Sequence, residues 1–291
     1  MKASTIHTFI LCQCICCTVL AQMQIQGGVR VGGIKYEGDL APNSFVISTS
    51  ALRFDFGAFT TYKLTNWSAL MVTYHHGNLG GSDVLSNSSG RRERNLAFWS
   101  PVDELSMSGM FFYAIKHRRR ERTFKPYLTL GVGLFRFNPQ TQYNGVWYHL
   151  QPLSTEGQGL SQYPNQKPYK LVQPCFPLGA GFQTSISRKW FLAFDLTLGK
   201  TLTDYLDDVS STYVPLSDLS QERGEIAAIL SNRSLNTNRE VQSLQLSLRG
   251  DSTQRDWYIT GSISLVANIF GQSKRENLWQ KKVNYKKCPK I

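Results

Sequence analysis

The segment Trp190–Thr201, WFLAFDLTLGKT, decides the fold of this chain. Apolar side chains occupy every second position from Trp190 to Leu198, and the positions between them include Asp195, Thr197 and Gly199. Successive side chains of a strand point to opposite faces, whereas a helix repeats every ~3.6 residues. The segment therefore predicts a β-strand with one apolar face and one polar face.

The same two-residue alternation recurs along the whole chain. Each such segment is long enough to cross a bilayer as a tilted strand, which takes about 9–11 residues. Eight strands are predicted, at 28–37, 50–62, 67–79, 102–116, 125–137, 172–187, 190–202 and 256–271.

The connections between these strands alternate in length. After a first connection at about 38–49, short turns at 63–66, 117–124 and 188–189 alternate with long segments at about 80–101, 138–171 and 203–255. Short turns at one end and long loops at the other are typical of outer-membrane barrels. We therefore predict an all-β fold, an eight-stranded antiparallel transmembrane β-barrel with short periplasmic turns, long extracellular loops and both termini in the periplasm.

Aromatic residues near the strand ends match the girdles that such barrels place at the two membrane interfaces. These residues are Trp67, Tyr127, Trp190 and Trp257.

The alternative is a soluble eight-stranded barrel whose apolar face points inward to a ligand. The predicted inner faces carry charged residues together with many Ser, Thr and Gly, whereas the opposite faces are continuously aliphatic, so the solvent outside the barrel is predicted to be lipid. An eight-stranded barrel is just wide enough for side chains to fill it. We therefore expect an ion-paired plug in the lumen rather than a channel. Its predicted members are Arg30, Arg53, Asp55, Glu104 and Asp195.

The N-terminus has the features of a signal peptide. Lys2 precedes an apolar stretch at 9–21, and Val19-Leu20-Ala21 fits a cleavage site before Gln22. Lipoprotein processing at Cys12 is the alternative, although bulky residues precede that cysteine. The expected domains are a signal peptide at 1–21, a barrel at 22–272 and a basic C-terminal tail at 273–291.

Cleavage would leave two cysteines, Cys175 and Cys288. The predicted topology puts them on opposite sides of the membrane, so two free thiols are expected. After the signal, no run of about eighteen apolar residues predicts a membrane helix.

Basic residues dominate the charge, with a formal net charge of +12. A secreted address makes nucleic acid an improbable partner and favours outer-membrane lipid, lipopolysaccharide or protein. Two basic clusters fall on the predicted periplasmic side and suggest a docking platform, although charge runs are often only solvated ends. Their candidate docking residues are Arg118, Arg119, Arg120 and Arg122, with Lys281 and Lys282 in the tail.

Three further groups of residues are candidates for chemistry. His75, His76 and His149 fall near the predicted outer rim, with Asp83 close by in sequence, but no nucleophile with a positioned base can be named. No catalytic, cofactor or metal site is therefore predicted.

In TDYLDDVS, the carboxylates of Asp204, Asp207 and Asp208 suggest either calcium or, more simply, a loop brace, because the alternating ligands and turn glycine of a calcium loop are missing. Arg91, Arg92 and Arg94 suit either lipopolysaccharide phosphates or a solvated loop.

Several motifs resemble one family. They are GIKYEGDL (33–40), YLTLGVGLFRFNPQ (127–140), STEGQGL (154–160), TDYLDDVSSTYV (203–214), AAILSNRS (227–234) and RGDSTQRDWYITG (249–261). Together they are similar to the DUF6089 family of Bacteroidota outer-membrane barrels, over about residues 28–271. Asp204, Tyr205, Asp207, Asp208 and Tyr213 match a loop motif of that family.

The resemblance implies a PorG-like component of the type IX secretion system, an accessory of secretion or gliding that anchors a periplasmic ring lipoprotein complex. The expected function is therefore non-enzymatic anchoring or assembly. The alternative is an independent surface barrel for adhesion or membrane integrity, acting through the loops at 138–171 and 203–255. An outer-membrane enzyme ranks third.

Overall fold

The computed structural model describes residues 24–42, 51–113, 124–187, 189–234 and 247–270. The predicted signal peptide, the basic segment at 117–122 and the C-terminal tail lie outside these residues. Within the described ranges, no helix is long and apolar enough to span a membrane.

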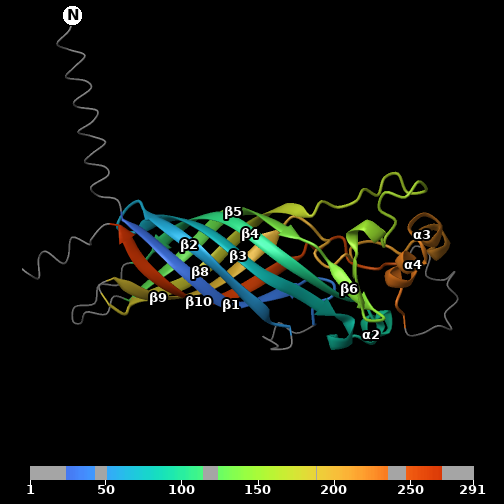
Figure 1. Cartoon of the computed structure of the whole chain (residues 1–291), viewed down its shortest axis with the longest axis horizontal. Coiled ribbons are helices and arrows are strands. Elements are labelled where there is room, and N and C mark those ends of the chain that lie inside the picture. Colours follow the sequence, from blue (N-terminus) through green and yellow to red (C-terminus); the bar gives the residue numbers. More distant parts are fainter. Residues whose placement is uncertain (1–23, 43–50, 114–123, 188, 235–246, 271–291) are drawn as a thin grey trace, which may run out of the picture.

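Eight antiparallel strands form a closed barrel, as predicted (Figure 1). They follow the order β3-β2-β1-β10-β9-β8-β5-β4, and pairing of β3 with β4 closes the sheet. The strands are β1 (Ile25–Glu37), β2 (Arg53–Lys63), β3 (Ser68–Ser82), β4 (Ala97–Phe112), β5 (Phe124–Phe137), β8 (Val172–Ser185), β9 (Trp190–Thr201) and β10 (Trp257–Phe270).

The two ends of the barrel differ. Ile25 pairs with Phe270, so the first and last strands meet at the short-turn end. At the other end, the long-loop end, the connections fold into a cap (Figure 1). The cap contains the hairpin β6 (Gln140–Tyr143) and β7 (Val146–His149), the helices α2 (Ser89–Arg94), α3 (Leu216–Arg223) and α4 (Glu225–Ser231), and 3-10 turns at Asp83–Leu85 and Gln151–Leu153.

These cap elements were not predicted from the sequence. The helices have only six to eight residues, which is too short to be stable without tertiary contacts. The hairpin turns at Asn144 and Gly145, whose φ angles of 50° and 80° are those of a two-residue turn favoured by Asn-Gly. That dipeptide was a usable signal.

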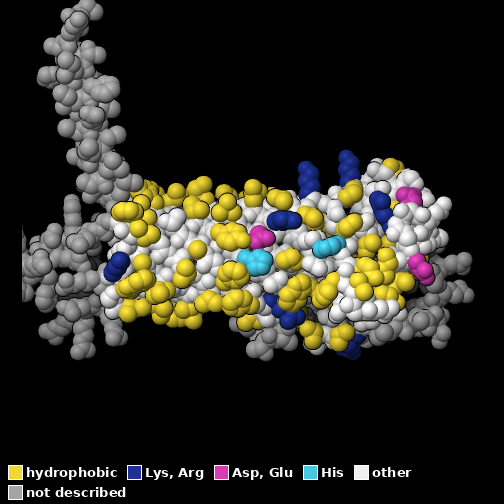
Figure 2. Space-filling model, viewed as in Figure 1, with side chains coloured by type: hydrophobic (Ala, Val, Ile, Leu, Met, Phe, Trp, Pro, Cys, Tyr) yellow, Lys and Arg dark blue, Asp and Glu magenta, His cyan; other side chains and the backbone are white. Residues whose placement is uncertain are grey.

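The two faces of the barrel wall follow the alternation in the sequence. Leu196 is 59% exposed on the outer face, whereas the neighbouring Asp195 points into the lumen. On the face seen in Figure 2, hydrophobic side chains are spread over the barrel, and charged side chains gather mostly toward the long-loop end. A barrel wall of exposed aliphatic side chains is the surface that a transmembrane barrel presents to lipid.

The position predicted for Tyr127, in the aromatic girdle at the membrane interface, was wrong. Trp67 and Trp190 are 58% and 43% exposed, but Tyr127 is only 4% exposed and donates a hydrogen bond to Asp195 inside the lumen. Period two puts Tyr127 on the same face as Thr129, which is also buried.

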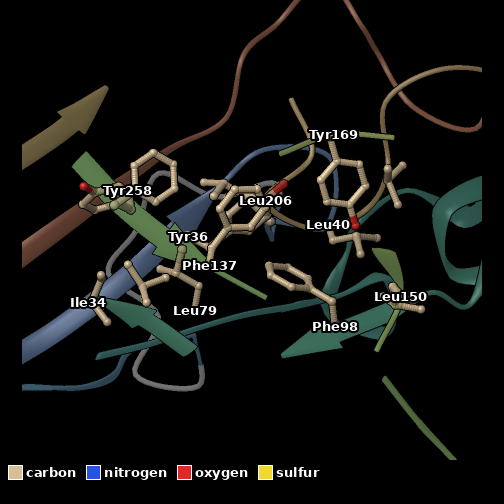
Figure 3. Packing of buried hydrophobic residues seen from close by; sticks show 14 of the residues in the cluster. Ile34, Tyr36, Leu40, Leu79, Phe98, Phe137, Leu150, Tyr169, Leu206 and Tyr258 are labelled. Carbon is tan, nitrogen blue, oxygen red and sulfur yellow. The ribbon is translucent and has the colours of Figure 1, made fainter. Parts of the chain in front are cut away.

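Buried aromatic and aliphatic side chains fill the long-loop end of the lumen. Tyr36 meets Phe98 edge to face at 4.8 Å, and Phe135 stacks on Phe137 at 5.4 Å. The same cluster continues into the cap through residues such as Leu150 (Figure 3). We call this cluster the aromatic plug; it comprises Ile34, Tyr36, Leu79, Phe98, Val102, Phe135, Phe137 and Tyr258 of the barrel with Leu40, Leu150, Tyr169 and Leu206 of the cap.

Glycines allow the large plug residues to fit. A Cβ added at Gly199 in β9 would lie 2.3 Å from the ring of Tyr258, whereas one at Gly261 in β10 would meet nothing within 4 Å. The first position thus lacks space for any side chain, and the second does not.

We expect Gly199→Ala to destabilise the barrel and Gly261→Ala to leave it nearly unchanged. Overpacking a well-packed interior costs about 1–3 kcal/mol. The measurement is urea unfolding in lipid, followed by the electrophoretic shift between folded and unfolded barrel. Equal loss of stability in both variants would contradict the packing described for Tyr258.

Candidate functional site

A layer of charged side chains lies below the aromatic plug. A guanidinium nitrogen of Arg30 is 3.2 Å from Asp55, and the other oxygen of Asp55 is 2.7 Å from Nδ1 of His75. Nε2 of His75 is 2.9 Å from Glu104, which also accepts from the hydroxyl of Tyr258. We call Arg30, Asp55, His75 and Glu104 the charged layer.

Both ring nitrogens of His75 therefore face carboxylates. A carboxylate only accepts hydrogen bonds, so a ring that carries a proton on each nitrogen satisfies both partners. With that ring charged, two cations balance two anions in the layer. Buried charges are tolerated only when they are paired in this way.

The position predicted for His75 was wrong. It does not lie at the outer rim, because its side chain points into the lumen and is 3% exposed. His76, the next residue, points outward and pairs with Asp103 at 2.9 Å. The parity of β3 was the missed signal, since His75 shares a face with the buried Thr73.

Two predicted lumen residues have partners other than those expected. Asp195 accepts a hydrogen bond from Tyr127. Arg53 makes no ion pair with any described residue, and its guanidinium lies 5.1 Å from the ring centroid of Trp99. Arg53 begins β2, two residues closer to the cap than Asp55, so the aromatic side chain is the neighbour within its reach.

A cavity occupies the lumen between the charged layer and the short-turn end. Its volume is about 480 Å³, including space continuous with solvent. Arg30 is a lining residue on the side of the charged layer, while Gln26, Thr61 and Gln183 line it near the short-turn ends of β1, β2 and β8.

The cap is held by an arginine that sequence reasoning missed. Arg249 is 3% exposed, and its guanidinium lies 3.0 Å from Glu156 and 3.7 Å from Asp208. It also donates to the carbonyl oxygen of Ser231 at the end of α4. One buried cation therefore joins the connections β7–β8 and β9–β10. Glu156 and Arg249 both lie in the motifs quoted above, but those motifs do not indicate which residues pair.

The DYLDDVS segment contributes the matching carboxylates. Asp207 accepts from the hydroxyl of Tyr36 at 2.6 Å and from the amide of Leu40 at 3.1 Å. Asp208 accepts from the hydroxyl of Tyr169 at 2.7 Å, and Tyr205 stacks on the same Tyr169 ring with centroids 4.7 Å apart.

The other two residues of the family loop motif are Asp204 and Tyr213, and they do not bond to the cap as Asp207 and Asp208 do. The backbone amide of Tyr213 donates to the carbonyl oxygen of Ser247 at 3.0 Å. Neither buried carboxylate oxygen of Asp204 has a partner at normal hydrogen-bond length in the described ranges, although the hydroxyl of Ser210 is near enough to lower the pKa of Asp204. Asp207 and Asp208 thus act as a loop brace, as expected for the segment, whereas Asp204 does not share that bonding.

Burial raises the pKa of these cap carboxyl groups. The pKa of Asp204 is raised to about 7 by burial and by the nearby charges of Asp39 and Glu156. Burial also raises the pKa of Asp208 to about 6, although Arg249 opposes the shift. The pKa of Asp207 is raised by burial and by the charge of Asp39.

The three loop arginines are engaged with the cap itself. Arg94 donates to Asp83 at 2.8 Å, Arg91 donates to the carbonyl oxygen of Ala41 at 2.7 Å, and Arg92 donates to that of Ser86 at 2.9 Å. Asp83 is therefore a partner of arginine and not of the histidines. This arrangement favours a structural role for the three arginines.

The remaining predictions concern His149, the two cysteines, the docking residues and the absence of a metal site. His149 is exposed in the β6–β7 hairpin, and Cys175 carries a free thiol buried in the lumen. The docking residues Arg118, Arg119, Arg120, Arg122, Lys281 and Lys282, with Cys288, lie outside the described residues. The described ranges hold no group of three or more His, Cys, Asp or Glu side chains placed to bind a metal.

The histidine pair of β3 offers a matched test. We expect His75→Ala to destabilise the barrel by about 3–5 kcal/mol, because it leaves Asp55 and Glu104 as buried carboxylates without their shared partner. His76→Ala removes a half-exposed pair and should have a much smaller effect. Urea unfolding in lipid measures both, and equal effects would refute the described orientation of β3.

The raised pKa of Asp204 predicts a pH-dependent cap. A carboxyl whose folded-state pKa is raised contributes stability below its usual pKa of 3.8, and that contribution is lost as pH rises through about 7. Asp204→Asn stays neutral, so at pH 8 its cap loops should be cleaved by protease more slowly than the wild type. Solvent screening limits the ratio to roughly tenfold.

At pH 4 the two proteins should be cleaved equally fast. Glu93→Gln is the control, because Glu93 is an exposed carboxylate of the cap helix α2. Protection at pH 8 in this control, or none in Asp204→Asn, would contradict the electrostatics described for Asp204.

Comparison with solved structures gives likenesses of low sequence identity. Neisserial surface protein A is 9% identical with a TM-score of 0.40, covering 85% of this chain and 97% of its own. Ail, the attachment invasion locus protein of Yersinia pestis, is 8% identical with a TM-score of 0.39, covering 84% and 98%. The N-terminal β-barrel domain of Pseudomonas aeruginosa OprF is 10% identical with a TM-score of 0.33, covering 84% and 99%.

No curated protein matches the sequence. A family model does match, over residues 5–219, a range that begins before and ends earlier than the resemblance seen in the motifs. It includes the DYLDDVS segment but not the buried Arg249. This chain belongs to the family described as Domain of unknown function (DUF6089).

Proposed function

We propose that this chain is a non-enzymatic outer-membrane barrel that anchors or assembles a protein complex on its periplasmic side. In this proposal the signal peptide at 1–21 is cleaved, the short-turn end faces the periplasm and the cap faces outward. The apolar barrel wall supports a membrane location.

The closed outer mouth is the observation that carries the proposal. The aromatic plug fills the long-loop end of the lumen, and the cap braced by Arg249 packs onto that cluster. A barrel sealed at one mouth by its own core has no path for a solute. Its activity would then lie on a surface, and the short-turn end has the cavity and the ends of β4 and β10, after which the basic segments follow in the sequence.

Charge supports a protein partner at that end. Arg118, Arg119, Arg120 and Arg122 lie in the connection between β4 and β5, and Lys281 and Lys282 follow β10. Both segments therefore leave the barrel at the short-turn end. Clustered basic charge attracts acidic protein surfaces.

Membership in DUF6089 makes a role in type IX secretion or gliding the specific form of this proposal. The partner would be a periplasmic ring lipoprotein complex, as the sequence resemblance implies. The proposal also places outer-membrane lipid and lipopolysaccharide against the barrel wall, and it involves no cofactor and no nucleic acid.

An independent surface barrel is the second candidate. Val146 and Trp147 in the β6–β7 hairpin are each 52% exposed beyond the barrel strands. Exposed apolar side chains on an ordered hairpin suit an adhesive contact.

Charge reversal tests the anchoring proposal. A variant with Arg118→Glu, Arg119→Glu and Arg120→Glu that ends at residue 272 should lose its co-purifying periplasmic partners in cells of the native host. The reason is that like charges repel at the docking surface. The tagged full-length chain is the reference, and the folded-barrel shift on electrophoresis confirms assembly.

A variant with Val146→Ala and Trp147→Ala is the control and should retain those partners. Undiminished partners in the charge-reversed, truncated variant would refute anchoring through these residues. Loss of surface attachment in the hairpin variant alone would favour the second candidate.

A further inference from the structure

The cavity at the short-turn end has polar groups that the protein leaves unsatisfied. Four of its lining side chains have a buried nitrogen or oxygen without a hydrogen-bond partner at bonding distance. They are Nε of Arg30, Nε2 of Gln183, Oγ1 of Thr73 and Oγ of Ser264.

These side chains are deeply buried. Thr73, Gln183 and Ser264 are 6%, 5% and 1% exposed, and the side chain of Arg30 is 9% exposed. A buried donor without a partner costs about 1–3 kcal/mol. Four such groups around one cavity therefore indicate that something entering the cavity satisfies them.

The chemistry of the four groups selects the ligand. Arg30 Nε and Gln183 Nε2 only donate hydrogen bonds, whereas the hydroxyls of Thr73 and Ser264 donate or accept. A ligand that matches all four needs an acceptor oxygen for the nitrogens and a polar hydrogen or second acceptor for the hydroxyls. A carboxamide has both, on a single carbon atom.

Charge argues against an ion. The guanidinium of Arg30 is already paired with Asp55, and the carboxylate of Asp195, which also lines the cavity, accepts from Tyr127. A carboxylate entering here would lose its hydration without gaining a free cation. An uncharged group avoids that penalty.

The width of the barrel favours a ligand of one functional group. Eight strands enclose a lumen just wide enough for side chains to fill it, so a group the size of a side chain suits the space between the lining residues. Phe59, Met71 and Met110 also line the cavity and suit the aliphatic stem of a side chain.

We propose that this cavity is a binding site for a single carboxamide group, the side chain of an Asn or Gln in a peptide that enters from the periplasmic end. This inference rests on the orientation in the proposed function and gives the anchored partner a point of insertion into the lumen.

Thiol labelling of the purified full-length barrel tests the site. Ser264→Cys places a thiol in the cavity, and Ser100→Cys is the matched control, because Ser100 is equally buried at 0% but lies beyond the charged layer toward the cap. Both carry Cys288→Ser, and a parent with only that change reports any background from Cys175. The reagent is the small neutral methyl methanethiosulfonate, read by mass spectrometry.

We expect Ser264→Cys to react at least tenfold faster than Ser100→Cys. Acetamide should slow labelling of Ser264→Cys at least threefold, relative to its effect on the exposed Ser187→Cys, whereas acetate of the same shape should not. Gln183→Leu should remove the acetamide protection, and Gln173→Leu at the other end of β8 should preserve it.

Equal protection by acetate, or no protection by either compound, would overturn the proposal in favour of an anion site or of bound water only. Labelling of Ser264→Cys no faster than Ser100→Cys would also overturn it. If Ser264→Cys does not give a folded barrel, Thr73→Cys takes its place with the same expected outcomes. The assay needs no partner protein, so its failure is distinguishable from failure of the co-purification test.

Discussion

Backbone hydrogen bonding in lipid is the constraint on which this structure depends. In hydrocarbon no water can satisfy an exposed N–H or C=O, so a sheet is tolerated only when it closes on itself. The pairing of β3 with β4 meets that demand over fifteen residue pairs, from Ser68 with Phe111 to Ser82 with Ala97. Closure leaves no free edge, and it encloses a lumen that eight strands make narrow.

The narrow lumen then imposes its own rules. Some large side chains need glycine on the facing strand, as Tyr258 needs Gly199. Buried charges of opposite sign lie in contact with one another, as in the charged layer around His75. The interior is accordingly layered, with the aromatic plug at the long-loop end, the charged layer below it and the polar cavity toward the short turns. This order gives the two ends of the barrel different chemistry.

The cap follows the same logic outside the membrane. Its long connections stay ordered because buried charges join them, with Arg249 between Glu156 and Asp208, and Arg94 against Asp83. Removing one member of such a set strands the others without a partner. The family motif DYLDDVS is therefore explained, through Asp207 and Asp208, by the need to fasten the cap to the plug, and no chemistry on a substrate is required for it.

Period two in segments such as 190–201 determined the strands, their inward and outward faces and the closed barrel, because alternation and loop length are properties of the sequence alone. The lumen charges at Arg30, Asp55, Glu104 and Asp195 were likewise visible as polar positions on apolar strands. Their partners were not, since pairing depends on register and stagger between strands far apart in sequence. Only the tertiary structure placed His75 between two carboxylates, set Tyr127 against Asp195 and joined Arg249 to Glu156 across 93 residues, because these contacts arise from how the closed barrel and its loops pack in space.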